Sequence, residues 1–458
     1  MEERAQLIEQ VEAKIGGRSL IWFGTRGIDA DPLHSIRQFD GVYSLIARLG
    51  NPSWQPDQEV CLEDVTHTRV DLNRYTIDDD LSDAAAFLHN RMMMAIGEGA
   101  LVAAYRSCHF LSAASFARLG SKSVLSLFFG IQSAFDHKPW VETQLQSCGI
   151  RTIPWDYYSD YEWDQIRERA ATGPLVLRAS YSDGGTGLRL ITAGSTLPTA
   201  PPRVQDRLIA VSRYLNPNVP LNVSGCVWPS GRVTLHAPSA QLIGFRELTQ
   251  NIFGYCGNDF SSLTSLLSDS EIDQLEQISL AAGTWLHSAG YRGAFGVDAV
   301  LYRGQILLTE VNPRFQGCSA TGAEVSKSLG LTDVYLDHLG AFLGIEPGAE
   351  RPSLREMARE QAHPSIAKSH ITCYASDGPM RLKPDAGLRD MPGAHIKGVP
   401  SEARLLLAED SMLFKLVIDG PALVSNTPNP SLEPSVRNQV VSLKSRMFEV
   451  MATGDPRG

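Results

Sequence analysis

The stretch Leu307–Gly317, LLTEVNPRFQG, places polar side chains at every second position after an apolar run. These residues are Glu310, Asn312 and Arg314. Because side chains alternate between the two faces of a strand, we expect the three groups to share one face. An exposed polar strand end, in which Glu310 pairs with Arg314, accounts for the same pattern. The neighbouring sequence therefore has to distinguish a functional site from an ordinary surface.

A further acidic residue, Asp298, precedes this stretch in a predicted hairpin over residues 293–311. A two-residue turn would put Glu310 on the face opposite Asp298. A three-residue loop over 302–304, with glycine at its left-handed third position, would put Asp298, Glu310 and Asn312 on one face. We predict the three-residue loop. Two carboxylates and an amide oxygen are then suitable ligands for Mg²⁺, with Mn²⁺ as the alternative ion.

A glycine-rich run, Asp183-Gly184-Gly185-Thr186-Gly187, lies upstream between two predicted strands. The backbone N–H groups of such a loop can bind phosphates. No Gly-Lys-Ser/Thr follows it, and a strand rather than a helix comes next, so it is neither a P-loop nor a dinucleotide fingerprint. Arg178 on the entering strand and Lys138 at a helix start supply two cations for a triphosphate. Taken singly, a plain turn and two solvated charges remain the alternative.

Composition sets outer limits on the protein class. The chain has 458 residues, 43% of them hydrophobic and 20% charged, which is typical of a globular protein with two to four domains. Its net charge is −10, with no long Lys/Arg tract, so we expect no nucleic-acid partner. Seven scattered cysteines without a C-x-x-C spacing argue against a disulfide framework or structural zinc site. We expect a cytoplasmic protein without a membrane partner, because no signal peptide and no apolar run of roughly 18 residues is present.

The order of predicted elements divides the chain into three parts. Apolar strands alternate with helices over residues 1–130, which favours an open parallel sheet. We expect a second domain over residues 131–345, with a lid subdomain at about 173–220. Residues 346–458 are predicted to form a linker and a small strand-rich domain. The fold class is therefore α/β combined with α+β.

Taken in order, these motifs resemble the ATP-grasp superfamily over residues 19–345. The resemblance implies an ATP-grasp fold with an N-terminal parallel-sheet domain and a small strand-rich C-terminal domain. The stretches that carry it are DHKPWVETQLQSCGIRTIPW (136–155), PLVLRASYSDGGTGLRLI (174–191), IAVSRYLN (209–216) and FGVDAVLYRGQILLTEVNPR (295–314). Two further stretches, LIWFGTRGIDADPLHSI (20–36) and MRLKPDAGLRDMPGAHIKGV (380–399), resemble the pheganomycin-type peptide ligases within this superfamily.

The resemblance implies ATP and Mg²⁺ as cofactors and assigns residues to each. Most members have lysine at the place of Arg178, and many have glutamate near Ser212 or Arg213, which this chain lacks. The implied phosphate-binding residues are Lys138, Arg178 and the lid run Asp183, Gly184, Gly185, Thr186 and Gly187. The implied adenine hinge is Ser212, Arg213 and Tyr214, the metal ligands are Asp298, Glu310 and Asn312, and Arg314 steadies the transferred phosphoryl group.

The implied activity is that of an ATP-dependent carboxylate–amine ligase. Such an enzyme joins the carboxylate of an amino acid or similar acid to the amine of an amino acid or peptide through an acyl phosphate. By the same resemblance we expect a role in peptide natural-product (antibiotic) biosynthesis, and a homodimer is an alternative to a monomer. Arg292, just before the hairpin, is a candidate to hold the acid, and His236 is a candidate base.

Three other functions fit parts of the pattern. A carboxylase or kinase would use the same fold on another small molecule, and a non-catalytic protein would only bind the nucleotide. A dehydrogenase is disfavoured, because the loop after the first strand has only Gly24 and Gly27 in place of a G-x-G-x-x-G turn.

Overall fold

The computed structural model describes most of the chain. The described residues are 2–46, 58–66, 83–117, 123–182, 184–185, 187–192, 206–348, 350–375, 380–383, 394–398, 406–407, 411–425 and 429–450.

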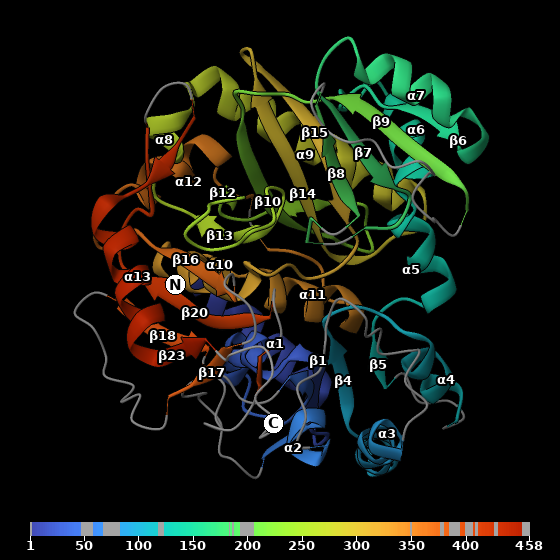
Figure 1. The fold of residues 1–458 in the computed structure, drawn as a ribbon. Coiled ribbons are helices and arrows are strands. Elements are labelled where there is room, and N and C mark those ends of the chain that lie inside the picture. The colour runs from blue at the N-terminus through green and yellow to red at the C-terminus, as the bar shows by residue number, and fades with distance from the viewer. Residues whose placement is uncertain are drawn as a thin grey trace.

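An all-parallel sheet forms the N-terminal part, as predicted, and lies at one end of the molecule (Figure 1). Its strand order is β3-β2-β1-β4-β5, and the helices α1, α2, α3 and α4 belong to it. Two of its strands, β2 and β3, were not predicted. The bounds are α1 (Glu2–Ile15), β1 (Leu20–Arg26), β2 (Phe39–Ile46), β3 (Glu59–Cys61), α2 (Leu62–Thr66), α3 (Asp83–Gly97), β4 (Leu101–Ala104), α4 (His109–Ala117) and β5 (Val124–Leu125).

A four-stranded antiparallel sheet lies at the opposite end of the molecule (Figure 1). Its order is β6-β9-β7-β8; β7, β8 and β9 lie within residues 173–220, whereas β6 precedes them. Its small core includes Trp163 and Ile166 of α7. The bounds here are α5 (Phe129–Asp136), α6 (Lys138–Ser147), β6 (Asp156–Ser159), α7 (Trp163–Ala170), β7 (Leu175–Ala179), β8 (Leu188–Ile191) and β9 (Leu208–Arg213).

A nine-stranded sheet joins these two parts, and its main path runs β15-β14-β10-β12-β13-β16-β20-β18 with β11 beside β10. The long helix α9 packs on it through Ile272 and Leu275. The bounds are β10 (Val219–Val227), β11 (Val233–Leu235), β12 (Ser239–Ile243), β13 (Tyr255–Asp259), α8 (Leu263–Leu266), α9 (Asp269–Ser288), β14 (Gly293–Tyr302), β15 (Gln305–Asn312), α10 (Ser319–Ser328) and α11 (Val334–Leu343).

The C-terminal region is rich in strands, as predicted, and three of its strands extend the large sheet. The predicted linker contains a helix, α12, which begins at a capping box between Ser353 and Glu356. The bounds are α12 (Leu354–Gln361), β16 (Ser369–Tyr374), β17 (Met380–Leu382), β18 (Ala394–Gly398), β19 (Leu406–Leu407), β20 (Met412–Ile418), β21 (Leu423–Val424), β22 (Ser431–Leu432), α13 (Pro434–Met447) and β23 (Phe448–Val450).

The β14–β15 hairpin differs from the prediction in its turn. Tyr302 pairs with Gln305, so the turn has two residues, and both Arg303 (φ 51°) and Gly304 (φ 74°) are left-handed. This is the backbone of a type I′ turn, whose twist matches that of the strands. The predicted three-residue loop is therefore wrong.

A β-bulge places Glu310 on the same face as Asp298, although a two-residue turn alone would put them on opposite faces. Leu308 faces Ala299, but the next pair is Asp298 with Glu310, so Thr309 is the extra residue. The bulge shifts the register by one residue and brings Glu310 to the face of Asp298. The alignment was correctly predicted, and its physical cause is the bulge.

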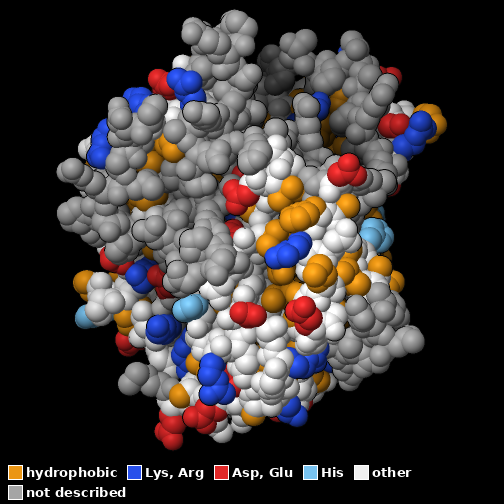
Figure 2. Space-filling model, turned by 90° about the horizontal axis from the view of Figure 1, so that it is seen from below, with side chains coloured by type: hydrophobic (Ala, Val, Ile, Leu, Met, Phe, Trp, Pro, Cys, Tyr) orange, Lys and Arg blue, Asp and Glu red, His pale blue; other side chains and the backbone are white. Residues whose placement is uncertain are grey.

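The domains share apolar contacts, and the surface is mixed in charge. Phe315, after β15, stacks on Tyr335 of α11 at 4.5 Å between ring centroids, and Trp22 of β1 contacts both rings. On the face shown in Figure 2, cationic and anionic side chains are interspersed.

None of the helices in the described residues has the length and apolar composition needed to cross a membrane.

Candidate functional site

The predicted metal ligands lie together on the large sheet. Asp298 pairs directly with Glu310 across the β14–β15 ladder, and Asn312 lies opposite Gly296. The Asn312 amide donates to Asp298 Oδ2 at 3.0 Å. The two carboxylates and the amide that the sequence pointed to therefore form one group.

Amide side chains surround Asp298 on its other side. Asn222 is its cross-strand partner on β10 and donates to Oδ1 at 2.6 Å, and Gln241 of β12 donates to the same oxygen at 3.0 Å. Gln316 adds a longer contact at 3.4 Å. Burial, followed by the charge of Glu310, raises the pKa of Asp298 to about 6. The amides hold the carboxyl group in place but do not neutralise it.

This donor set fits a divalent cation. Two carboxylates face each other across neighbouring strands, and like charges in that position repel. Within the described part of the chain, no three His, Cys, Asp or Glu side chains gather as a metal-ligand group. Two carboxylates and one amide oxygen are hard oxygen ligands of the kind that Mg²⁺ takes, and this ion commonly completes its shell with water and phosphate oxygens.

Lys138 connects this group to the glycine-rich loop. His137 caps α6 by accepting from Trp140 N at 3.3 Å, so Lys138 starts the helix as predicted. Its ammonium group donates to Ser182 O at 2.6 Å and lies 2.9 Å from Glu310 Oε1. Glu310 thus pairs with Lys138 rather than with Arg314, and the exposed-surface alternative with its Glu310–Arg314 pair does not hold.

Arg178 is buried and already paired. Its guanidinium lies 2.6 Å and 2.8 Å from the two carboxylate oxygens of Glu142, which lies one helical turn after Lys138. It also stacks over the Trp155 ring at 4.2 Å. Its side chain is only 3% exposed. Arg178 is therefore a fixed cation, with its position set by a carboxylate and an aromatic face.

The glycine loop follows the end of β7, whereas the hinge at the end of β9 lies beside the start of β7. Gly184, Gly185 and Gly187 all have positive φ, whereas Asp183 and Thr186 lie outside the described residues. The Asn251 amide donates to Gly185 O at 3.3 Å, so the loop lies against residues 251–254.

The predicted hinge residues differ in exposure. Ser212 is buried, Arg213 is exposed, and Tyr214 packs edge-on against Phe253. Ser212 Oγ, Trp155 Nε1 and Arg178 Nε are buried without a hydrogen-bond partner among the described residues. Such atoms usually indicate a missing partner, so the hinge is a fitting place for a polar ligand.

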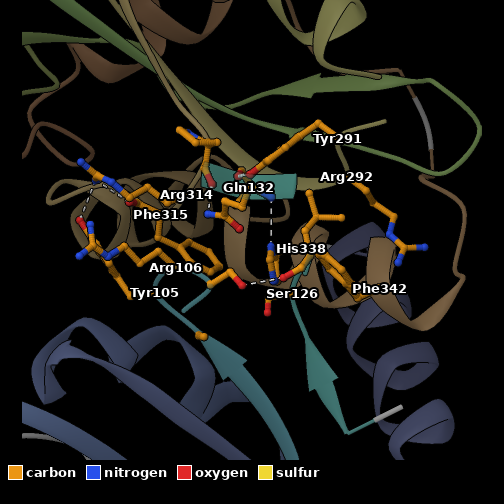
Figure 3. A pocket seen from close by; sticks show the side chains of 15 residues that line it. Tyr105, Arg106, Ser126, Gln132, Tyr291, Arg292, Arg314, Phe315, His338 and Phe342 are labelled. Atoms are coloured by element: carbon orange, nitrogen blue, oxygen red, sulfur yellow. Dashed lines mark hydrogen bonds between the residues drawn. The ribbon is translucent and has the colours of Figure 1, made fainter. Parts of the chain in front are cut away.

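The two predicted catalytic arginines line one cavity between the parallel sheet and the large sheet (Figure 3). Arg314 donates to Tyr105 Oη at 3.2 Å, and Arg292 lies over the Phe342 ring at 4.5 Å. His236 instead lies 3.3 Å from Asp337 Oδ2 in a buried cluster. The structure therefore brings the arginines together around a cavity, while the predicted base forms part of a different polar group.

The comparisons with known proteins support the same fold. Residues 143–318 match the family described as ATP-grasp domain, a range that includes every predicted site residue except Lys138. A carboxyaminoimidazole ribonucleotide synthase from Aspergillus clavatus, complexed with ATP, has a TM-score of 0.57 at 13% identity and covers 93% of this chain and 98% of its own. The chain has the ATP-grasp fold.

Two further solved structures share the ATP-grasp fold. Biotin carboxylase from Campylobacter jejuni has a TM-score of 0.54 at 14% identity, covering 87% of both chains. The biotin carboxylase domain dimer of Hydrogenobacter thermophilus 2-oxoglutarate carboxylase, with MgADP and bicarbonate, has a TM-score of 0.51 at 14% identity, covering 92% of this chain and 84% of its own. No curated protein sequence matches the chain significantly.

Several residues of the candidate site were not predicted from the sequence. Glu142 is four positions after Lys138, so both side chains lie on the same helix face. This spacing could have indicated from the sequence that Glu142 lies near the site. Asn222, Gln241 and Gln316 meet Asp298 only through strand pairing and a loop, which no local spacing reveals.

Proposed function

We propose that this protein is an ATP-dependent, ADP-forming ligase that joins a carboxylate to an amine. The observation that carries the proposal is the Asp298–Glu310 pair facing Lys138, next to the loop of Gly184 and Gly185. This combination suits a Mg²⁺-bound triphosphate, because it offers carboxylates for the ion and a cation and N–H groups for the phosphates. The ATP-grasp fold supports it.

The residues have distinct roles in this proposal. Asp298, Glu310 and Asn312 would hold Mg²⁺, which offsets phosphate charge when bound. Lys138 and Arg178 orient the phosphates, with Arg178 held rigidly by Glu142. Ser212 Oγ and Trp155 Nε1 are available for the base or ribose.

The reaction has two steps. An oxygen of the acid attacks the γ-phosphorus, the bond to the bridging oxygen breaks, and ADP leaves. The amine nitrogen then attacks the acyl carbon, phosphate leaves with the former carboxylate oxygen, and the nitrogen loses a proton. Arg314 would stabilise negative charge on the transferring group and on the tetrahedral adduct. We infer amino acids or short peptides as substrates and a role in peptide natural-product biosynthesis, a finer assignment that rests on the pheganomycin-type sequence resemblance.

A phosphate-release screen of paired acids and amines tests the proposal. We expect ADP and phosphate only when both a correct acid and a correct amine are present. Glu310→Ala should abolish the release while its circular dichroism spectrum stays that of the wild type. Full turnover by Glu310→Ala would contradict the metal assignment.

A carboxylase is the second candidate, because the similar structures include biotin carboxylases, one of them with bicarbonate. Bicarbonate would then take the place of the organic acid. ADP release that depends on bicarbonate, and on no amino acid, would favour this candidate over the ligase.

A further inference from the structure

The cavity beside Arg314 carries more positive charge than one carboxylate needs. Its lining includes three arginines, Arg106, Arg292 and Arg314, and none of its fifteen lining residues is Asp or Glu. Arg106 is the second residue after β4, so it lies at the carboxyl edge of the parallel sheet, where open α/β sheets commonly bind ligands.

Arg106 and Arg292 have no acidic partner within the described residues. Neither guanidinium forms an ion pair or a hydrogen bond with a described residue, and Arg292 Nε is buried without a partner. Burial lowers the pKa of Arg292, with no carboxylate acting in the other direction. By contrast, the arginines Arg178 and Arg351 each have a carboxylate within 3.0 Å. A partly buried cation without a counter-ion costs free energy, so these two arginines are suited to an anion from outside the chain.

The cavity offers one further polar contact. Ser126 Oγ lines it and is buried without a hydrogen-bond partner. The cavity is partly open to solvent. Figure 3 shows Arg314 and Arg292 on opposite sides of the cluster of side chains that line the cavity. A small ligand with a charge at each end matches this arrangement.

We propose that the acid substrate carries a second anionic group, a carboxylate or a phosphate, and that Arg292 binds this group while the reacting carboxylate lies at Arg314. Arg106 adds positive charge to the same cavity. The proposal rests on the proposed function, since it identifies the class of acid that the ligase accepts. Dicarboxylic amino acids and phosphorylated hydroxy or amino acids belong to this class.

Calorimetric titration of the full-length protein, with Mg²⁺ and a non-hydrolysable ATP analogue present, tests the proposal directly. The probes are two matched pairs, glutamate with glutamine and phosphoserine with serine. We expect the anionic member of at least one pair to bind about tenfold more tightly or better, as a charge-assisted hydrogen bond predicts. The pair that discriminates identifies the second group as a carboxylate or a phosphate.

Variants connect this preference to the cavity. Arg292→Gln should reduce the preference about tenfold, and Arg106→Gln should reduce it by a smaller factor, whereas Arg292→Lys should restore part of it. Arg167→Gln, at an exposed position of α7, is the matched control and should leave the preference unchanged. Equal binding within both pairs, no binding of any probe, or an unchanged preference in Arg292→Gln would overturn the proposal.

These experiments distinguish a failure of the anion-site proposal from a failure of the proposed ligase activity. Selective, Arg292-dependent binding without ADP release for any amine would uphold the anion site and contradict the ligase. ADP release with neutral acids alone would uphold the ligase and overturn the second anionic group.

Discussion

The ammonium group of Lys138 lies 2.9 Å from Glu310 Oε1 and also donates to Ser182 O at 2.6 Å. One side chain thus contacts the carboxylate pair on the large sheet and the strand end that enters the glycine loop. Lys138 is buried but Glu310 is 27% exposed, so the contacts are partly shielded from water. The lysine therefore couples the two halves of the candidate nucleotide site and partly neutralises Glu310.

Replacing Lys138 with methionine removes this cation while keeping the length of the side chain. We expect the KM for Mg-ATP to rise by about 10- to 100-fold, because a charge-assisted hydrogen bond contributes about 1.5–3 kcal/mol. Steady-state kinetics over a range of ATP concentrations measures it. Lys327→Met, at an exposed position of α10, is the control and should keep the wild-type KM. Equal KM values in the two variants would show that Lys138 does not bind the nucleotide.

The buried Arg178–Glu142 pair predicts an effect on stability. Glu142→Gln leaves the guanidinium without a counter-ion, which typically costs about 3–5 kcal/mol. Urea unfolding of the nucleotide-free protein measures the loss. Asp156→Asn breaks a more exposed pair with Arg169 and should cost less than about 1 kcal/mol. A Glu142→Gln protein as stable as Asp156→Asn would refute the inference that Arg178 needs this partner.

Two neighbouring glycines of the loop allow two effects to be distinguished. One is the contact of the loop with residues 251–254, and the other is its left-handed backbone conformation. A Cβ on Gly185 would lie 2.0 Å from Phe253 O, whereas one on Gly184 would meet nothing within 4 Å. Both have positive φ, so alanine is strained at either position. We expect Gly185→Ala to raise the KM for ATP at least about tenfold more than Gly184→Ala does, because displacing the loop weakens phosphate contacts. Similar kinetics in both variants would count against a role for the contact with residues 251–254.

The raised pKa of Asp298 predicts how stability changes with pH. In the folded protein the pKa is about 6, above the ordinary 3.8, so the folded state holds the proton more tightly. The resulting stabilisation is complete below pH 3.8 and is lost as pH rises through 6. The Asp298→Asn variant has no carboxyl group to titrate at this position, so it does not lose this stabilisation. Its free energy of unfolding, relative to that of the wild type, should therefore increase from pH 4.5 to pH 7.5.

Urea unfolding of both proteins at the two pH values, without metal or nucleotide, measures this effect. The comparison cancels the contributions of titrating groups that do not interact with Asp298. A constant difference between wild type and Asp298→Asn would contradict the assigned pKa shift.

The sequence predicted the parts of the fold that depend on local pattern. Alternation placed Glu310, Asn312 and Arg314 on one face, and the parallel N-terminal sheet followed from alternating strands and helices. The turn was mispredicted, because a bulge at Thr309 compensates for a two-residue turn and neither feature fixes register alone. Helix α12 was missed within a stretch rich in Pro, Glu and Arg, although Ser353 and Glu356 have capping-box spacing.

Other features depend on contacts between distant parts of the chain. The amides around Asp298 come from β10, β12 and the loop after β15, which only the sheet brings together. The cavity lining combines residues from the ends of β4 and β5 with Arg292 and Arg314. The domain boundaries at 130 and 345 and the homodimer remain predictions.

Transfer of oxygen from the acid to phosphate is the direct test for an acyl-phosphate intermediate. The acid is supplied with ¹⁸O in its carboxylate, together with ATP, Mg²⁺ and the amine, and the released phosphate is analysed by mass spectrometry. An acyl-phosphate ligase must transfer one carboxylate oxygen to each phosphate, so we predict one ¹⁸O per phosphate. Release of phosphate without ¹⁸O, while the amide product forms, would contradict the account.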